Sequence, residues 1–166
     1  MILIQPDQLL ATGKLEIILL DEVGRVKDHR NVKNTVTISG KKYIASRMKD
    51  TVGGHTIAPQ MSHMAIGTGT TGTDDNIQTE STATGHRVAL TTAGGTVTNN
   101  TVLYTATFAA NVIVADVAVT EAGIFNYATK ATSPTATQFM LCRTSFAVVN
   151  KLVADTLTIN WTVTIN

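Results

Sequence analysis

The segment just before the final asparagine constrains the fold of this chain more than any other. In Thr156–Ile165, apolar side chains alternate without exception with threonine or asparagine. A period of two places successive side chains on opposite faces of a β-strand, so one face of this segment is predicted to be buried and the other covered by threonine. Trp161, the only tryptophan, and Ile159 lie on the apolar face and are predicted core residues.

The composition extends this β signal to the whole chain. Among 166 residues there are 29 threonines, and threonine, valine and isoleucine together make up about a third of the chain. These β-branched residues are stiff at χ1 and suit a pleated surface, which excludes a mostly helical protein. Strand signals recur about every ten residues between glycine-rich turns, and this pattern predicts an antiparallel β-sandwich or a jelly-roll-like barrel.

Several segments can be assigned individually. Lys14–Leu20 is predicted to be the first strand of a hairpin, and Lys41–Lys49 to be a short amphipathic helix. Tyr104 and Phe108 share the apolar face of another predicted strand, so both are assigned to the core. Val112–Val119 is nearly all apolar and predicts a strand that is buried on both faces.

The distribution of charge divides the chain into three parts. Residues 1–50 hold nine of the thirteen lysines and arginines, and a glycine- and proline-containing stretch follows near residues 51–59. We therefore predict an N-terminal arm (1–13), a small hairpin and helix unit (14–55) and an antiparallel β-domain (56–166). The arm contains apolar residues without a sustained period, and it either packs on a neighbouring chain or forms an edge strand of its own domain. These candidate interface residues are Ile2, Leu3, Ile4, Leu9 and Leu10.

Charge and cysteine content restrict the classes of partner. A net charge of +1 argues against a general nucleic-acid binder, and no apolar run reaches membrane-spanning length. The N-terminus lacks the pattern of a secretory signal, so assembly in a cytoplasm is expected. Cys142 is the only cysteine, which excludes an intrachain disulfide and a cysteine-based zinc site, and its apolar neighbours predict a buried, inert thiol.

Motifs with possible chemistry are better explained by loops. Gly67–Gly72 matches G-x-G-x-x-G, but two acidic residues follow it instead of an apolar helix. Asp74 and Asp75 lack the order of a calcium-binding loop, and His55, His63 and His86 have no metal-ligand spacing. We therefore predict no catalytic residue, no metal site and no cofactor.

A few charged residues are candidates for structural ion pairs. Glu121 follows the apolar run and precedes a glycine, so its carboxylate is predicted to be half-buried beside a turn and to need a partner. Arg87 and Arg143 are among the few cations in the second part of the chain, and Glu80 is a second candidate acid. We assign these four residues to structural pairs that pin loops.

The order of these features carries a resemblance to a known family. The relevant residues are Met64–Gly69, Glu80, Arg87, Glu121–Asn126, Met140–Arg143, Phe146, Asn150, Lys151 and Asp155–Leu157, followed by the tryptophan-containing strand. Over about residues 14–166 this set resembles a module of tailed-bacteriophage structural proteins. The module occurs in the N-terminal attachment domains of contractile-tail fibres, and short capsid accessory and tail proteins are similar to it. The longer spacing between Glu80 and Arg87 and the cysteine at position 142 depart from the family pattern.

The resemblance implies a virion structural protein. A compact β-domain with an arm fits a capsid decoration (cement) protein, which would bind the major capsid protein and other copies of itself, as a homotrimer. A tail-fibre or baseplate attachment protein is the alternative, and a small enzyme is a distant one. Neither nucleic acid nor a membrane is an expected partner, and the expected location is the virion.

Overall fold

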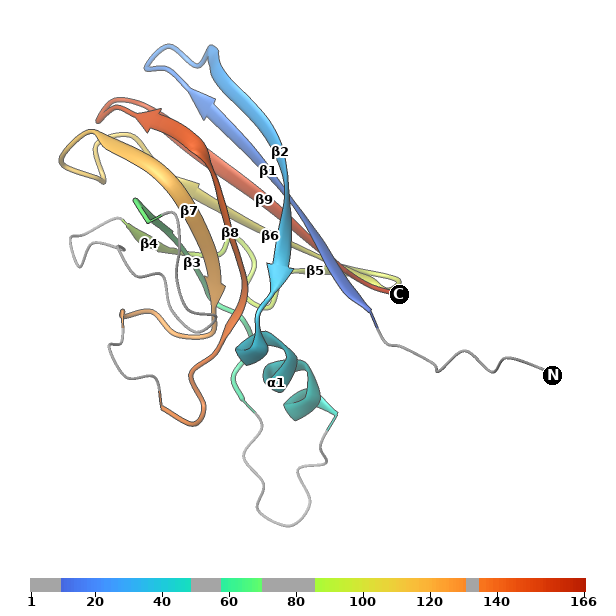
Figure 1. The fold of residues 1–166 in the computed structure, drawn as a ribbon. Coiled ribbons are helices and arrows are strands. Elements are labelled where there is room, and N and C mark those ends of the chain that lie inside the picture. Colours follow the sequence, from blue (N-terminus) through green and yellow to red (C-terminus); the bar gives the residue numbers. More distant parts are fainter. Residues whose placement is uncertain (1–9, 49–57, 70–85, 131–134) are drawn as a thin grey trace.

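The computed structural model describes residues 10–48, 58–69, 86–130 and 135–166 (Figure 1). Within these residues, nine strands and one helix follow one another as β1 (Ala11–Leu20), β2 (Val26–Val36), α1 (Ile38–Arg47), β3 (His63–Gly67), β4 (Arg87–Ala89), β5 (Thr96–Thr98), β6 (Thr101–Phe108), β7 (Val117–Phe125), β8 (Met140–Lys151) and β9 (Thr156–Ile165). The strands lie in the order β4-β3-β7-β8-β2-β1-β9-β6-β5, and neighbours are antiparallel. The predicted mainly β fold, a sandwich of antiparallel sheets with one short helix, is confirmed.

Strand β2 belongs to both sheets. From Val26 to Asn34 it pairs with β1, and at Thr35 and Val36 it pairs with β8. On the other side of the sandwich, the segment after β4 joins the sheets, because Leu90 N donates to Ser62 O at 2.9 Å and Thr91 N donates to Thr105 O at 2.8 Å. The two sheets therefore enclose a core that is bounded on both sides by backbone hydrogen bonds.

The alternation along the last strand places its side chains as the sequence predicts. Trp161 and Ile159 of β9 are fully buried, whereas the threonines and the asparagine that alternate with the apolar residues of this strand are partly exposed. Tyr104 and Phe108 of β6 lie opposite Trp161 and Leu157 in the ladder and are buried with them. Burial of large side chains of this kind stabilises a fold by roughly 1.5–3 kcal/mol each.

The first part of the chain shares this core. Leu15, Ile17 and Leu19 of β1 are buried in the same cluster as Trp161, and β1 pairs with β9 along its whole length. Residues 14–48 therefore do not form a separate core, and most of the predicted boundary near residue 55 lies outside the described residues. Ala11–Gly13, which we assign to the arm from sequence, belong to β1. The strand ladder extends one residue further, because Leu10 and Asn166 exchange two backbone hydrogen bonds.

The helix begins three residues earlier than predicted. Thr37 caps α1, since its Oγ1 accepts from Gly40 N at 2.8 Å and donates to Met140 O. A threonine side chain at this position satisfies a backbone donor that the first helical turn leaves free. The missing side chain of Gly40 lets the helix approach β8 closely, because an added Cβ would lie 2.0 Å from Leu141 O.

One predicted strand is largely a loop. Val112–Val119 is interpreted from sequence as a strand buried on both faces, but only its last three residues lie in β7. Val112 and Val114 lie in the connection from β6, and Val114 is 80% exposed. An apolar run alone does not fix a strand where no neighbouring strand is available to pair with it.

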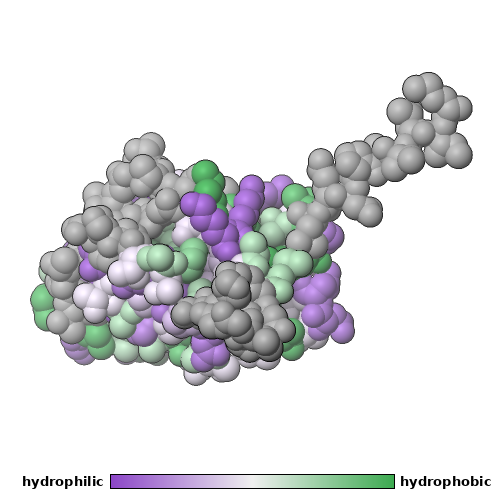
Figure 2. All heavy atoms as spheres, turned by 90° about the horizontal axis from the view of Figure 1, so that it is seen from below, coloured by the Kyte–Doolittle hydropathy of each residue, from purple (hydrophilic) through white to green (hydrophobic). Residues whose placement is uncertain are grey.

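Apolar residues are also exposed beside hydrophilic ones at the α1 end of the molecule (Figure 2).

We predict that Gly40→Ala destabilises the protein. In an unconstrained helix this change is stabilising, but here the new methyl group meets a backbone oxygen that cannot move independently of β8. Overpacking of this kind costs about 1–3 kcal/mol. Chemical denaturation of the variant should show this loss, whereas Lys42→Ala, on the exposed side of the same helix, should be nearly neutral. An unchanged or increased stability of Gly40→Ala would contradict the close packing of α1 on β8.

Candidate functional site

Glu121 forms the centre of a buried ion pair. Its side chain in β7 is fully buried, and its Oε2 contacts Arg143 of β8 through Nη2 at 2.5 Å and Nε at 3.2 Å. Its other oxygen, Oε1, accepts a hydrogen bond from Gly69 N at 3.1 Å. Thr120 Oγ1 donates to Gly69 O at 2.8 Å, so the chain after β3 is held on both sides. Glu121 is thus more deeply buried than the half-buried carboxylate expected from sequence, and it lies within a strand instead of beside a turn.

Arg87 has a different environment. Its guanidinium lies 3.8 Å from the ring centroid of Phe125 and 4.8 Å from that of Tyr127, and its Nη1 donates to Tyr127 O at 3.1 Å. The two rings meet edge to face, with centroids 5.3 Å apart. A guanidinium over aromatic faces is stabilised by the ring quadrupole. Glu80, a candidate partner for Arg87, lies outside the described residues.

The motifs that carry the family resemblance meet in one place. Met64–Gly69 includes most of β3, Glu121–Asn126 covers the end of β7, and Met140–Arg143 begins β8. These three strands are neighbours in one sheet, in the order β3-β7-β8. The Glu121–Arg143 pair and the bond to Gly69 connect all three segments. These three segments therefore form one packing unit of the fold.

The residues considered for chemistry do not assemble into a reactive centre in the described part of the chain. No group of three or more His, Cys, Asp or Glu residues that could hold a metal ion occurs there. Cys142 is fully buried, and burial raises the pKa of its thiol to about 12, which keeps it protonated. Burial, with the nearby charge of Arg87, lowers the pKa of His63, whose Nδ1 lies 2.8 Å from Ser62 Oγ.

The remaining sequence candidates are separated or lie elsewhere. His86 is buried just before β4, where its backbone oxygen accepts from Ile66 N at 2.9 Å, and His55, Asp74 and Asp75 lie outside the described residues. The region that includes Gly67–Gly72 is described only as far as Gly69. No helix among the described residues is long and apolar enough to cross a membrane.

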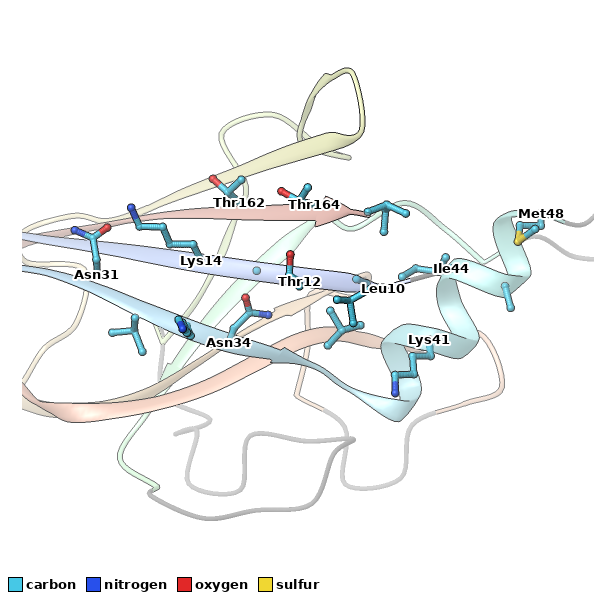
Figure 3. Close-up of a pocket in the computed structure, with 17 residues that line it drawn as sticks. Leu10, Thr12, Lys14, Asn31, Asn34, Lys41, Ile44, Met48, Thr162 and Thr164 are labelled. Carbon is cyan, nitrogen blue, oxygen red and sulfur yellow. The ribbon is translucent and has the colours of Figure 1, made fainter. Parts of the chain in front are cut away.

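A groove lies where β1, β2 and α1 diverge (Figure 3). It has a volume of about 970 Å³. Its walls are the first residues of β1, the last residues of β2, one side of α1 and the end of β9. The apolar side chains that line it include Leu10, Val32, Val36, Ile44, Met48 and Ile165. Leu10 is 57% exposed and Met48 is 80% exposed. Exposed apolar side chains around one concavity are typical of binding surfaces.

The charged side chains among the described residues that line the groove are all of one sign. Among the described residues that line it, Lys14, Lys33 and Lys41 are basic and none is acidic. The groove therefore suits an apolar ligand segment that also carries a negative charge.

Sequence reasoning did not identify this groove. Leu10 is the only predicted interface residue that lines it, and the other arm residues, Ile2, Leu3, Ile4 and Leu9, lie outside the described residues. The groove depends on where β2 leaves β1, and no local pattern records that. Ile44 and Met48, the apolar residues of the predicted amphipathic helix, both line it, and their spacing is the related signal in the sequence.

Comparisons with family models, with curated proteins and with solved structures find no match to this chain.

We predict that Arg143→Met destabilises the protein strongly. The substitution keeps most of the side-chain volume but removes the cation in contact with the fully buried Glu121. Breaking one partner of a buried pair costs about 3–5 kcal/mol. The double variant with Glu121→Gln should recover part of the loss, because the buried charge is then absent. Denaturation of the four proteins gives the coupling free energy of the pair.

The matched control for this cycle is Arg25→Met. Arg25 pairs with Asp21 at the surface and is 80% exposed, so its removal should change stability little. A loss for Arg143→Met no larger than that for Arg25→Met would show that the buried pair does not hold the sheet together.

Proposed function

We propose that this chain is a structural protein of a tailed-bacteriophage virion, and that it is a capsid decoration protein. The observation that supports this proposal best is the meeting of the family-like motifs at Glu121, Arg143 and Gly69. These residues hold three strand segments together, which supports a structural role for the motifs. A non-enzymatic role agrees with this reading.

The surface of the described chain favours assembly in many copies. Threonines of β9 and β6 cover the outer face of one sheet and bond to one another, as between Thr101 and Thr164 at 3.2 Å. Charged residues are 15% of the chain, so repulsion between neighbouring copies is low. The partners we propose are the major capsid protein and other copies of this chain in a homotrimer. Neither nucleic acid nor a membrane is required.

The end of the sandwich opposite α1 supports the alternative function, which is attachment in the tail. Val153 N donates to Asp116 Oδ1 at 2.9 Å, and Asn111 N donates to Val153 O at 2.8 Å, so two loops lie together there. Val114 and Leu152 are exposed on these loops. An apolar loop surface of this kind suits the docking of a further structural chain, as a fibre or baseplate attachment protein requires.

The proposal is tested by locating the protein in the particle. We expect mass spectrometry and immunogold labelling of separated heads and tails to find it in the head fraction, in many copies. Heads that lack it should release DNA at a lower temperature than complete heads, and adding the purified protein should restore the difference. Its presence in the tail fraction alone would support the attachment role instead, and its absence from particles would contradict both roles.

A further inference from the structure

The groove contains an open strand edge. Leu10 and Asn166 exchange two backbone hydrogen bonds, so Ala11, the next residue of β1, directs its N–H and C=O away from β9. The ladder with β2 begins only at Gly13, because β2 leaves β1 at Asn34 to pair with β8. The backbone groups of Ala11 therefore have no ladder partner among the described residues. Such an edge can accept an extended peptide through main-chain hydrogen bonds.

Two lysines beside this edge lack a counter-charge. Lys14 and Lys33 are directly opposite each other in the β1–β2 ladder, and both are exposed. Like charges in this position repel each other and weaken the pairing of the strands. Among the described residues, no ion pair or side-chain hydrogen bond holds either lysine. Glu16, on the same face of β1, is already bonded to His29 at 2.9 Å and to Asn160 at 3.0 Å. A carboxylate from a ligand would relieve the repulsion between the lysines.

The pleat of β1 determines how a peptide on this edge would be ordered. Thr12 and Lys14 lie on one side of β1 (Figure 3), whereas Ala11 lies on the other side and packs against the core. Val36 and Ile44, which line the groove, also pack with the core. Successive side chains of a strand added beside Ala11 would therefore point in turn toward the lysines and toward these apolar walls. Acidic residues suit the first set of positions, and apolar residues suit the second.

We propose that the groove binds an extended peptide segment of another protein, in which acidic and apolar side chains alternate. The open edge at Ala11 favours a peptide over an acyl chain, because a hydrocarbon would leave the N–H and C=O of this residue without partners. Lys14 and Lys33, together with Lys41 on α1, favour an acidic segment. Residues 1–9 of this chain fit less well, since they contain a single acid, Asp7, and no alternation of acidic with apolar residues. The inference goes beyond the proposed function and does not depend on it.

Fluorescence anisotropy of labelled peptides with the full chain tests this proposal. The probe is a peptide of eight residues in which valine alternates with glutamate. One control has the same composition in two blocks, and the other is the alternating peptide with its valine amides N-methylated. We expect the alternating peptide to bind at least about tenfold more tightly than either control, because only it combines the charge pattern with free backbone donors. Equal affinity of the block peptide or of the N-methylated peptide would overturn the proposal.

Variants of the protein locate the binding in the groove. Lys14→Met and Lys33→Met should each weaken binding of the alternating peptide at least about fivefold, because each removes a counter-charge. Lys42→Met, which removes an exposed lysine of α1 outside the groove lining, is the matched control and should change the affinity less than about twofold. Ala45→Glu, on the exposed groove side of α1, should weaken binding at least about tenfold without lowering the melting temperature. Equal effects of the three lysine variants, or unchanged binding to the Ala45→Glu protein, would overturn the proposal.

Two further measurements distinguish this partner from the other possible occupants. If the first residues of the same chain filled the groove, the double substitution Ile2→Asp and Ile4→Asp would release it and raise the affinity for the peptide at least about tenfold. If a second copy filled the groove, the affinity for the peptide would fall as the protein concentration is raised. We expect neither change, and either result would overturn the proposal. Peptide binding with the expected controls would support it whether or not the protein is found in heads.

Discussion

The fold depends on one strand that belongs to two sheets. Strand β2 leaves β1 at Asn34 and joins β8 at Thr35 and Val36. This change of partner carries the backbone from one layer of the sandwich to the other without a long connection. Thr37 follows at once and caps α1, so the place where β2 changes partner also fixes where the helix begins. The same divergence leaves the start of β1 without a second neighbour among the described residues, and the groove results from it.

The buried carboxylate of Glu121 imposes a second constraint, on the other sheet. A carboxylate taken out of water needs both a counter-charge and hydrogen bonds, and it obtains them from Arg143 and from the backbone of Gly69. Replacing such a pair with apolar residues is often neutral for stability, whereas removing one partner alone is strongly destabilising. Here the pair selects which residue of β8 and which part of the chain after β3 lie against β7. The strand register of this sheet is thereby linked to a single side chain.

The sequence predicts best where local pattern and tertiary environment agree. Thr156–Ile165 alternates without a break because a single buried face meets the core along the whole strand, and the strand class of the fold follows from such segments. Val112–Val119 misleads because apolar composition does not reveal whether a pairing strand is present. The helix start depends on a contact between Thr37 and β8, about a hundred residues later in the chain, which no local pattern contains.

The candidate site likewise has one part that the local sequence predicts and one part that depends on tertiary contacts. The need of Glu121 for a cation could be predicted from its position after an apolar run, and Arg143 was one of few choices. The groove could not be predicted, because it is formed by residues from β1, β2, α1 and β9 that share no motif. Its walls can be located only once the strand order is known. The apolar arm is recognisable from sequence, but the groove is not.

The most direct test of this account is an experimental high-resolution structure of the purified protein. We predict that β2 pairs with β1 as far as Asn34 and with β8 at Thr35 and Val36, and that Glu121 contacts both Arg143 and the backbone of Gly69. A β2 strand that stays paired with β1 beyond Asn34, or a Glu121 side chain that contacts neither group, would contradict the account.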